Sequence, residues 1–383
     1  MNIIRPTLRL PACLCTLLCA LGCTLSTAAP FDQAEIKDPT ASFIDVKARR
    51  AFLQQAKPDN KLRAAALTPY DCQSAAPVAP QEGPMLIPGR YLVGNHGAVH
   101  PDYERIVALY RDFENVLANL GGLYVVSGKP AYAQCLLNQL ALWADAGALL
   151  DYNPNERKQA WYQTEWSAGV AAQALSLVIT ESTLDPDKKQ RVLAWLNRVS
   201  HKQISEPGAD ITCCNNHAYW RGLQATMIGV LTNDKELFRW GLGRYAIGIG
   251  QIAEDGSLPL EMTRHEQALH YQNYALQPLT MMAEIAARQG IDLYAYSENG
   301  RDFHRAVRFV IAAIKDDALI HKYASEKQDR RAFSAGRGDL AWLEYYLNRF
   351  PQSDPLGMMG KPFFYPRTGG AVTLLVYTPP QDP

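Results

Sequence analysis

The chain has 383 residues, 48% of them hydrophobic, which is enough for one large domain or two ordinary ones with a sizeable core. Its 38 lysine and arginine residues equal its 38 aspartate and glutamate residues, so the formal net charge is zero. This balance excludes a global field that would attract nucleic acid or an acidic membrane, and an acidic ligand therefore requires a local basic cleft.

The first 29 residues have the pattern of a secretory signal peptide. Two arginines precede an uncharged run over residues 10–25, and small residues follow at 26–29. The uncharged run is shorter than the roughly 20 apolar residues that a transmembrane helix needs. We therefore expect export with cleavage near Ala28 or Ala29, and lipoprotein anchoring at Cys23 is the alternative. The mature domain is expected over residues 30–383.

Four cysteines remain after removal of the signal: Cys72, Cys135, Cys213 and Cys214. An even number of cysteines in an exported chain is typical of disulfides. Neighbouring cysteines rarely bridge on geometric grounds, which disfavours a Cys213–Cys214 bond, but the sequence alone leaves all three pairings open.

Residues 67–94 are rich in proline and glycine, which indicates a lid or an extended packing arm rather than a regular element. The end of this segment and the residues after it combine glycine hinges with side chains suited to a ligand. These candidates are Arg90, Tyr91, Asn95 and His96. An ordinary surface loop is the alternative interpretation.

From residue 106 onward the chain is patterned as helices. Apolar residues recur three or four positions apart over residues 106–120, 130–143, 192–199, 237–249, 269–285 and 303–314. Asp185 before Pro186 is typical of a helix cap followed by proline in the first turn. An alternating, strand-like pattern is found only near residues 371–377. Many helices joined by short loops predict an all-α protein with an α/α architecture and a single domain.

The densest group of polar residues lies over 213–220, at the start of a predicted helix. The apolar spacing from Trp220 to Val230 places Asn215, Asn216 and His217 at the N-terminal end of that helix. The partial positive charge there suits an anionic ligand. The alternative is structural, because asparagine at a helix start is usually a cap and a single histidine is more often a surface residue than a catalyst.

A second polar group lies over residues 261–274. If this segment is helical, Arg264 and Tyr271 are seven positions apart and share one face. A zinc site is not expected, because His265 and His270 are five residues apart and do not share a face. Since the chain also lacks paired cysteine spacing for zinc, a phosphate loop and a nucleophile elbow, we expect no metal and no cofactor.

Asparagine, histidine, arginine and tyrosine without a metal suit one kind of chemistry, the removal of a proton next to a carboxylate. In this scheme Asn216 and Arg264 bind the carboxylate and stabilise the enolate-like charge, while His217 and Tyr271 transfer protons. Arginine meets a carboxylate through two hydrogen bonds. A tyrosine base needs a cationic neighbour, which Arg264 is placed to provide.

With these residues, the chain resembles the alginate lyases of polysaccharide lyase family 5 over most of its mature length. The resemblance is specific over residues 215–220, where the family shows Asn-Asn-His-Ser-Tyr-Trp. A second group of matches is Leu258, Pro259, Glu261, Arg264, Ala268, Leu269, Tyr271, Asn273, Tyr274, Pro278 and Leu279. The resemblance implies an (α/α) toroid, an incomplete barrel of helical hairpins around a deep groove.

The resemblance also implies roles. Asn216 and Arg264 neutralise a uronate carboxylate, and His217 and Tyr271 serve a β-elimination. For a mannuronate-type sugar Tyr271 acts as base and then as acid with support from His217, whereas for the opposite C5 epimer His217 is the base. The product is an unsaturated 4-deoxy uronosyl end, formed without a metal.

The expected disulfides change as well. Some family members bridge two adjacent cysteines immediately before Asn-Asn-His, and Cys213 and Cys214 stand at that position. The resemblance therefore implies Cys72–Cys135 together with a Cys213–Cys214 bridge that stiffens the catalytic loop.

Departures from the family pattern affect the expected substrate. The stretch over residues 90–96 has no acidic residue, His265 and Gln267 stand where other members have arginines, and Leu260 replaces the usual asparagine. We expect a lyase for β-1,4-linked polyuronates of the alginate or polymannuronate type. The alternatives are a glucuronan or broad polyuronate lyase, acting on polyglucuronate or hyaluronate, and a non-catalytic periplasmic polysaccharide-binding protein. The proton-transfer pair argues against the last of these.

Other residues are candidates for binding the polymer. Aromatic platforms suit sugar rings and arginine suits carboxylates, although aromatic pairs at helical spacing are more often core and arginines are common on surfaces. The expected substrate-binding residues are Arg90, Tyr91, Asn95, His96, Gln163, Trp166, Asn215, His270, Tyr274 and Arg367. We expect a monomer whose partner is an anionic polysaccharide, with no nucleic acid partner and no membrane in the mature form.

Overall fold

The computed structural model describes residues 30–56, 66–208, 210–334, 336–351, 356 and 362–376. The expected signal peptide over residues 1–29, including Cys23, lies outside the described residues. Within them, no helix is both long enough and apolar enough to cross a membrane.

Helices dominate the described residues, which confirms the expected all-α class. Those of eight or more residues are α1 (Val46–Ala56), α3 (Tyr103–Ser127), α4 (Pro130–Asp145), α5 (Lys158–Val178), α6 (Pro186–Ser205), α7 (Asn216–Thr232), α8 (Lys235–Gly250), α10 (Ala268–Arg288), α11 (Phe303–Lys315) and α12 (Trp342–Arg349). The shorter elements are η1 (Asp210–Cys213), α9 (Pro259–Met262), η2 (His265–Gln267), the antiparallel pair β1 (Ser297–Glu298) and β2 (Arg301–Asp302), η3 (Asp317–Ile320), η4 (Arg331–Phe333), η5 (Pro366–Thr368) and α13 (Val372–Val376).

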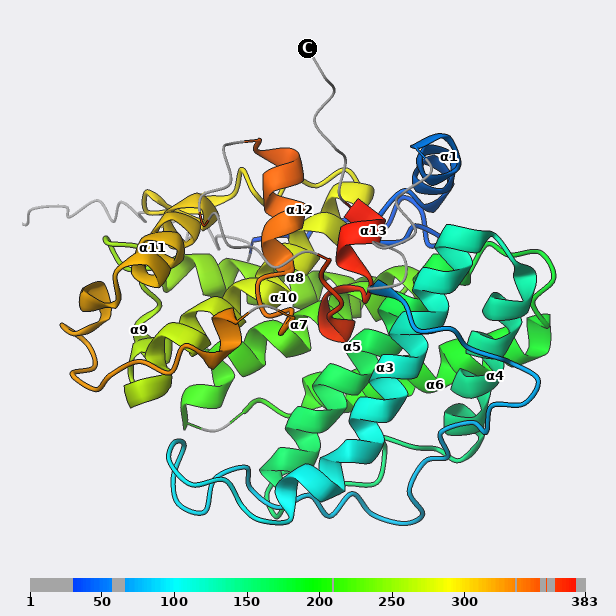
Figure 1. The fold of residues 1–383 in the computed structure, drawn as a ribbon, viewed down its shortest axis with the longest axis horizontal. Coiled ribbons are helices and arrows are strands. Elements are labelled where there is room, and N and C mark those ends of the chain that lie inside the picture. Colours follow the sequence, from blue (N-terminus) through cyan, green and yellow to red (C-terminus); the bar gives the residue numbers. More distant parts are fainter. Residues whose placement is uncertain are drawn as a thin grey trace, which may run out of the picture.

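Two layers of helices form the body of the molecule (Figure 1). Helices α3, α5, α7 and α10 contact one another in series and make the inner layer, and α5, α7 and α10 are buried over nearly their whole length. Helices α4, α6 and α8 pack against this layer and keep partly exposed faces. This alternation of inner and outer helices confirms the expected (α/α) toroid.

The inner helices all present their N-terminal halves to a single groove. The N-terminal halves of α3, α5, α7 and α10 contribute Tyr103, Gln163, Asn216 and Tyr271, respectively, to its wall. Because the unpaired N–H groups at helix starts carry partial positive charge, the backbone alone makes this side of the toroid favourable for anions.

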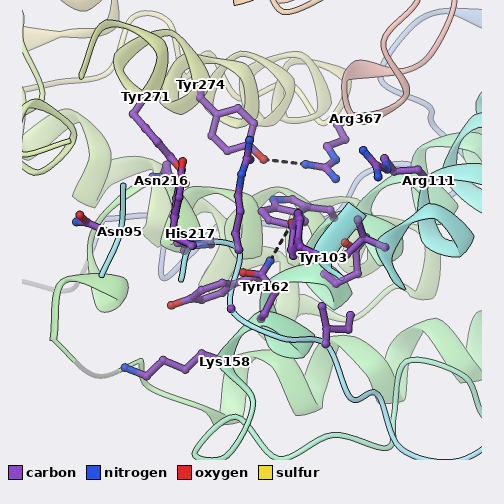
Figure 2. A pocket seen from close by; sticks show the side chains of 18 of the residues that line it. Asn95, Tyr103, Arg111, Lys158, Tyr162, Asn216, His217, Tyr271, Tyr274 and Arg367 are labelled. Atoms are coloured by element: carbon purple, nitrogen blue, oxygen red, sulfur yellow. Dashed lines mark hydrogen bonds between the residues drawn. The ribbon is translucent and has the colours of Figure 1, made fainter. Parts of the chain in front are cut away.

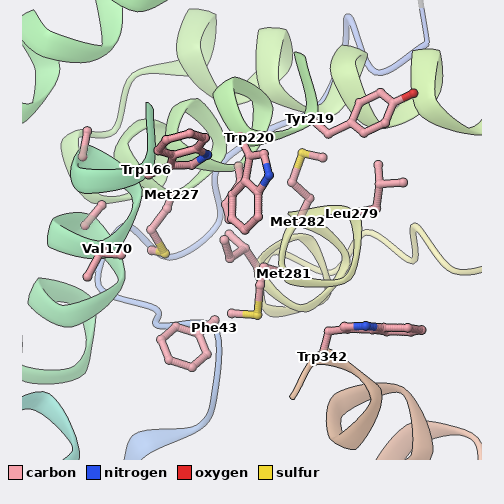
Figure 3. Close-up of a cluster of buried hydrophobic side chains, with 14 of the residues drawn as sticks. Phe43, Trp166, Val170, Tyr219, Trp220, Met227, Leu279, Met281, Met282 and Trp342 are labelled. Carbon is pink, nitrogen blue, oxygen red and sulfur yellow. The ribbon is translucent and has the colours of Figure 1, made fainter. Parts of the chain in front are cut away.

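Close packing around α7 fixes the groove wall. Figure 3 shows Trp220 of α7 beside Met281 and Met282 of α10, within the main hydrophobic core. Gly241 of α8 has no room for a side chain, because an added Cβ would lie 2.7 Å from the carbonyl oxygen of Gly222 in α7. The start of α7 is therefore held between well-packed neighbours.

Local sequence signals predict the start of α6 correctly but predict the wrong structure at the end of the described chain. Asp185 caps α6 as predicted, because its carboxylate accepts from the backbone N–H groups of Asp187 and Lys188. The strand-like alternation over residues 371–377 does not form a strand, since Val372–Val376 is helix α13. All five residues of α13 are buried, so alternating residue types there do not reflect alternating burial.

Candidate active site

A groove with a volume of about 1050 Å³ lies over the N-terminal ends of the inner helices (Figure 2). Its walls come from α3, α5, α7 and α10, from the loop that contains Arg90, and from η5. The four expected catalytic residues all line it, and they are Asn216, His217, Arg264 and Tyr271. The fold thus brings together two polar segments that are separate in the sequence.

Cationic side chains outnumber carboxyl groups in this groove. Among the described residues that line it, seven carry a positive charge: Arg90, Arg111, Arg157, Lys158, Arg264, Arg337 and Arg367. Four carry a carboxyl group: Glu104, Glu114, Glu156 and Asp339. The neutral chain thus contains the local basic cleft that an acidic ligand requires. Over the same described part of the chain, no group of three or more His, Cys, Asp or Glu residues is placed to hold a metal ion.

Asn216 is held by a buried carboxyl group. Its backbone N–H donates to Glu261 Oε1 over 2.7 Å, and its Nδ2 donates to Glu261 Oε2 over 2.8 Å. Asn215 caps the same helix by accepting from the backbone N–H of His217 over 3.0 Å. An amide nitrogen carries two hydrogens, so Asn216 keeps a second donor for a ligand.

His217 lies between an aromatic ring and a buried carboxyl group. Its ring stacks on Tyr162 with the centroids 3.6 Å apart, and its Nδ1 is 2.7 Å from Glu165 Oε1. Burial and the nearby guanidinium of Arg264 lower the pKa of His217 well below its usual value. The imidazole is therefore neutral near pH 7, which is the form that can accept a proton.

Arg264 and Tyr271 form the second pair. The guanidinium carbon lies 3.7 Å from the centroid of the Tyr271 ring, so the two side chains do meet as expected. The intervening chain is not one continuous helix, because Arg264 precedes η2 and His265 has a φ of 50° in the left-handed region. A guanidinium at this distance is attracted to the electron-rich face of the phenol ring.

Arg367 is built into one wall of the groove. It donates to the Tyr274 hydroxyl over 2.9 Å and to Glu114 Oε2 over 3.2 Å, and its guanidinium carbon lies 4.2 Å from the centroid of the Trp166 ring (Figure 2). Gln163 donates to the other oxygen of Glu114 over 2.9 Å. The alternative interpretation of Arg367 as an ordinary surface arginine is therefore wrong.

The loop after the proline-rich segment folds back on itself and forms part of the groove wall. Arg90, Tyr91 and Asn95 line the groove as expected. His96 is not among the lining residues, because its ring instead packs at a tilt against His265 with the centroids 4.3 Å apart. The loop is thus attached next to Arg264 by a contact between two histidines.

The other expected substrate-binding residues also line the groove: Gln163, Trp166, Asn215, His270, Tyr274 and Arg367. Burial, more than the nearby Arg90, lowers the pKa of His270 to about 4, so this imidazole is neutral at pH 7. Its buried Nδ1 has no hydrogen-bond partner among the described residues.

Sequence reasoning missed several residues of the site. Tyr103, Tyr162 and Tyr365 line the groove, and Glu165 holds His217 from behind it. Aromatic and acidic residues at helical spacing look like ordinary core or surface positions, so only tertiary packing identifies them, as the contact between α5 and α7 does for Tyr162 and Glu165. Glu261 belongs to the family pattern, but its hydrogen bonds to Asn216 could not be read from spacing.

The cysteines only partly follow the expected pairing. Cys213 and Cys214 form a disulfide bond directly before Asn215. Cys72 and Cys135 are free thiols in the structure, which differs from the expected Cys72–Cys135 bridge. The two thiols are hydrogen-bonded neighbours. Burial, together with this contact, raises the pKa of Cys135 to about 12. Their sulfur atoms are within hydrogen-bonding distance but are not joined by a disulfide bond.

Comparison with known proteins points in one direction. The sequence profile of the family described as alginate lyase matches residues 47–320. The chain is 35% identical over 263 residues to a polysaccharide lyase of Stenotrophomonas maltophilia, covering 68% of this chain and 76% of that protein. It is 31% identical over 267 residues to an alginate lyase of Pseudomonas fluorescens, covering 68% and 70%, respectively.

Solved structures are similar over nearly the whole fold. Alginate lyase A1-III from Sphingomonas species A1 is 61% identical, with a TM-score of 0.87 and coverage of 91% of this chain and 99% of that chain. A variant of A1-III with phenylalanine in place of a tyrosine, complexed with a tetrasaccharide, superposes with a TM-score of 0.89, covering 92% and 99%. A second variant, with alanine in place of a histidine, is also complexed with a tetrasaccharide.

Proposed function

Because the chain belongs to the alginate lyase family and is a polysaccharide lyase, we propose that it cleaves β-1,4-linked polyuronates of the alginate type by β-elimination without a metal ion. The observation that carries this proposal is the composition of one groove. An amide, a guanidinium, an imidazole and a phenol meet there among an excess of positive charge. A protein that only bound the polymer would have no need of a proton-transfer pair.

The carboxylate of the sugar at the cleavage point is bound between Asn216 and Arg264. The buried Nε of Arg264 has no hydrogen-bond partner among the described residues, and Asn216 retains its second amide hydrogen. These donors hold the enolate-like charge that forms on the carboxylate oxygens when the neighbouring C5 proton leaves. A single donor aimed at such a developing charge contributes about 10²–10³ in kcat.

Tyr271 handles the protons of a mannuronate-type sugar, in which the C5 hydrogen and the leaving oxygen lie on the same side of the ring. The C5–H bond breaks, a C4–C5 double bond forms and the C4–O bond breaks. Tyr271 reacts in its deprotonated form: it takes the C5 proton, becomes the phenol and then gives that proton to the leaving oxygen, so no water is consumed. Neutral His217 supports Tyr271 and is the base for the opposite C5 epimer.

The A1-III variants support these assignments. In that enzyme the substituted histidine and tyrosine are separated by the same number of residues as His217 and Tyr271. Both variants were complexed with a tetrasaccharide, which suits proteins that bind a polymer fragment without turning it over.

The proposal is tested by mixing the purified protein with polymannuronate, polyguluronate, polyglucuronate and hyaluronate. The readout is the ultraviolet absorbance of unsaturated uronosyl ends. We expect a rise with the alginate polymers that a metal chelator does not reduce. A rise only with polyglucuronate or hyaluronate assigns a glucuronan or broad polyuronate lyase instead, and binding without a rise for any polymer assigns a binding protein.

We also propose that the protein acts in the periplasm as a monomer. The Cys213–Cys214 disulfide supports an oxidising compartment, since such bonds are rare in the cytosol. Cell fractionation with intact mass measurement and size-exclusion chromatography test both points. An uncleaved cytoplasmic protein or a stable dimer contradicts them.

A further inference from the structure

Glu165 has an unusual position for an acidic residue. It lies in the middle of the inner helix α5, its side chain is fully buried, and it does not line the groove. One carboxyl oxygen is 2.7 Å from His217 Nδ1, and the other has no hydrogen-bond partner among the described residues. A buried carboxyl group with an unsatisfied oxygen destabilises a fold, so packing alone does not explain its presence.

The surroundings of His217 fix both its position and its orientation. Tyr162 stacks on one face of the imidazole with an interplanar angle of 19°. Glu165 occupies Nδ1, so Nε2 is the ring nitrogen left for a ligand in the groove. Tyr162 and Glu165 both lie on α5, which packs against α7, so two rigid helices together hold the ring.

Three guanidinium groups face this pair. Arg221 comes from α7, Arg264 precedes η2, and Arg367 comes from η5. Their positive charges disfavour an imidazolium and favour a carboxylate. Burial raises the pKa of Glu165 well above its usual value, and the smaller effects of Arg221 and Arg367 oppose this rise. A carboxylate can only accept a hydrogen bond, so with Glu165 ionised in its contact of 2.7 Å with Nδ1 the proton of a neutral His217 lies on Nδ1.

We propose that Glu165 is a positioning residue of the lyase reaction, which accepts the Nδ1 proton of His217 and so keeps Nε2 as an unprotonated nitrogen that faces the groove. This inference rests on the proposed function. Glu165 itself touches no substrate. It selects the tautomer of the histidine and holds the ring plane, as the outer partners of catalytic histidines generally do.

Glu165→Gln is the sharpest variant, because it keeps the volume of the side chain but allows the new amide to donate to Nδ1. The proton of His217 then moves to Nε2, so His217 can neither support Tyr271 as a proton acceptor nor serve as the base for the opposite C5 epimer. Since general acid–base catalysis contributes about 10²–10⁴ in rate, we expect kcat to fall by about 100-fold with KM nearly unchanged.

A matched control is Glu284→Gln. Glu284 is also a buried carboxyl group in an inner helix, but it pairs with Arg349 and Tyr294 and does not line the groove. We expect it to lose stability and to keep the kcat of the unmodified protein. An unchanged kcat in Glu165→Gln, or the same loss of kcat in Glu284→Gln, overturns the proposal.

A second measurement does not depend on turnover. Nitrogen NMR of protein labelled at histidine, with the His217 signals assigned from a His217→Asn variant, reports which ring nitrogen carries the proton. We expect Nδ1 to be protonated in the unmodified protein and Nε2 in Glu165→Gln. A proton on Nε2 in the unmodified protein overturns the inference. Inactivity of the unmodified protein on every polymer overturns the proposed function and leaves this tautomer measurement intact.

Discussion

Arg264 is the residue at which substrate binding and proton transfer meet. Its guanidinium lies over the Tyr271 ring and close enough to Glu261 to oppose the effect of burial on that carboxyl group. Glu261 in turn holds Asn216 through two hydrogen bonds. Arg264 is therefore close both to the Tyr271 phenol and to Glu261, the residue that holds Asn216.

The planar shape of Arg264 makes Arg264→Lys an informative change. Lysine keeps the positive charge but loses both the forked contact with a carboxylate and the flat contact with the ring. We expect kcat/KM to fall by about 100-fold in steady-state assays, as for the loss of one donor to a developing charge. Arg105→Lys, at a surface arginine paired with Asp102, is the control and should behave as the unmodified protein. Equal activity of both variants contradicts the assigned role.

Asp339 gives a pH dependence with a definite sign. Burial raises the pKa of this carboxyl group to about 6, against the opposing effect of Arg337. The folded chain therefore holds the proton more tightly than the unfolded chain does, and stability falls as the pH rises from about 4 to about 6. We expect Asp339→Asn to be more stable than the unmodified protein by about 2–3 kcal/mol above pH 7 and equally stable below about pH 4. Urea unfolding at the two pH values checks this, and a difference that is independent of pH contradicts it.

At the scale of elements, the cap of α7 connects stability to catalysis. Asn215 accepts from the His217 backbone N–H, and the cap therefore also positions the catalytic histidine. We expect Asn215→Ala to lower the free energy of unfolding by about 1 kcal/mol and to lower kcat as well. Asp185→Ala removes the cap of α6 away from the groove and should cost similar stability without changing kcat. If the two variants lose kcat equally, or if neither does, the link between this cap and catalysis is refuted.

Element starts are also where sequence reasoning performed best. Helix α7 begins at Asn216 and α6 at Pro186, as expected, because caps and proline act through local hydrogen bonds that do not depend on the rest of the fold. The approach of α5 to α7, and with it the pairing of Glu165 with His217, depends on tertiary packing and left no local signal. The position of His96 outside the groove lining and the helical form of α13 were missed for the same reason.

At the scale of the whole molecule, the neutral chain concentrates its positive charge in one place. The excess of cationic side chains and the four inner helix starts both face the groove. An anionic polymer is therefore attracted to the groove without any net charge on the protein. Charges that are partly exposed are screened over a Debye length of about 8 Å at physiological salt.

Ionic strength should therefore act on binding rather than on chemistry. We expect KM to rise several-fold as salt is increased from about 0.01 M to about 1 M, while kcat changes little. Salt screens the partly exposed charges that attract the polymer, whereas it has little effect on interactions between buried groups. The melting temperature measured in the same buffers is the control. A KM that is independent of salt contradicts electrostatic attraction to the groove.

In the proposed reaction, Tyr271 transfers the proton in a groove that holds the sugar without help from the Tyr271 hydroxyl. Tyr271→Phe tests it most directly, because phenylalanine keeps the ring that Arg264 covers and removes only the oxygen. Polymer binding by calorimetry and product formation by ultraviolet absorbance are measured on the same preparation. We expect binding at nearly the original affinity with no unsaturated product, whereas turnover at a rate near that of the unmodified protein would remove Tyr271 from proton transfer.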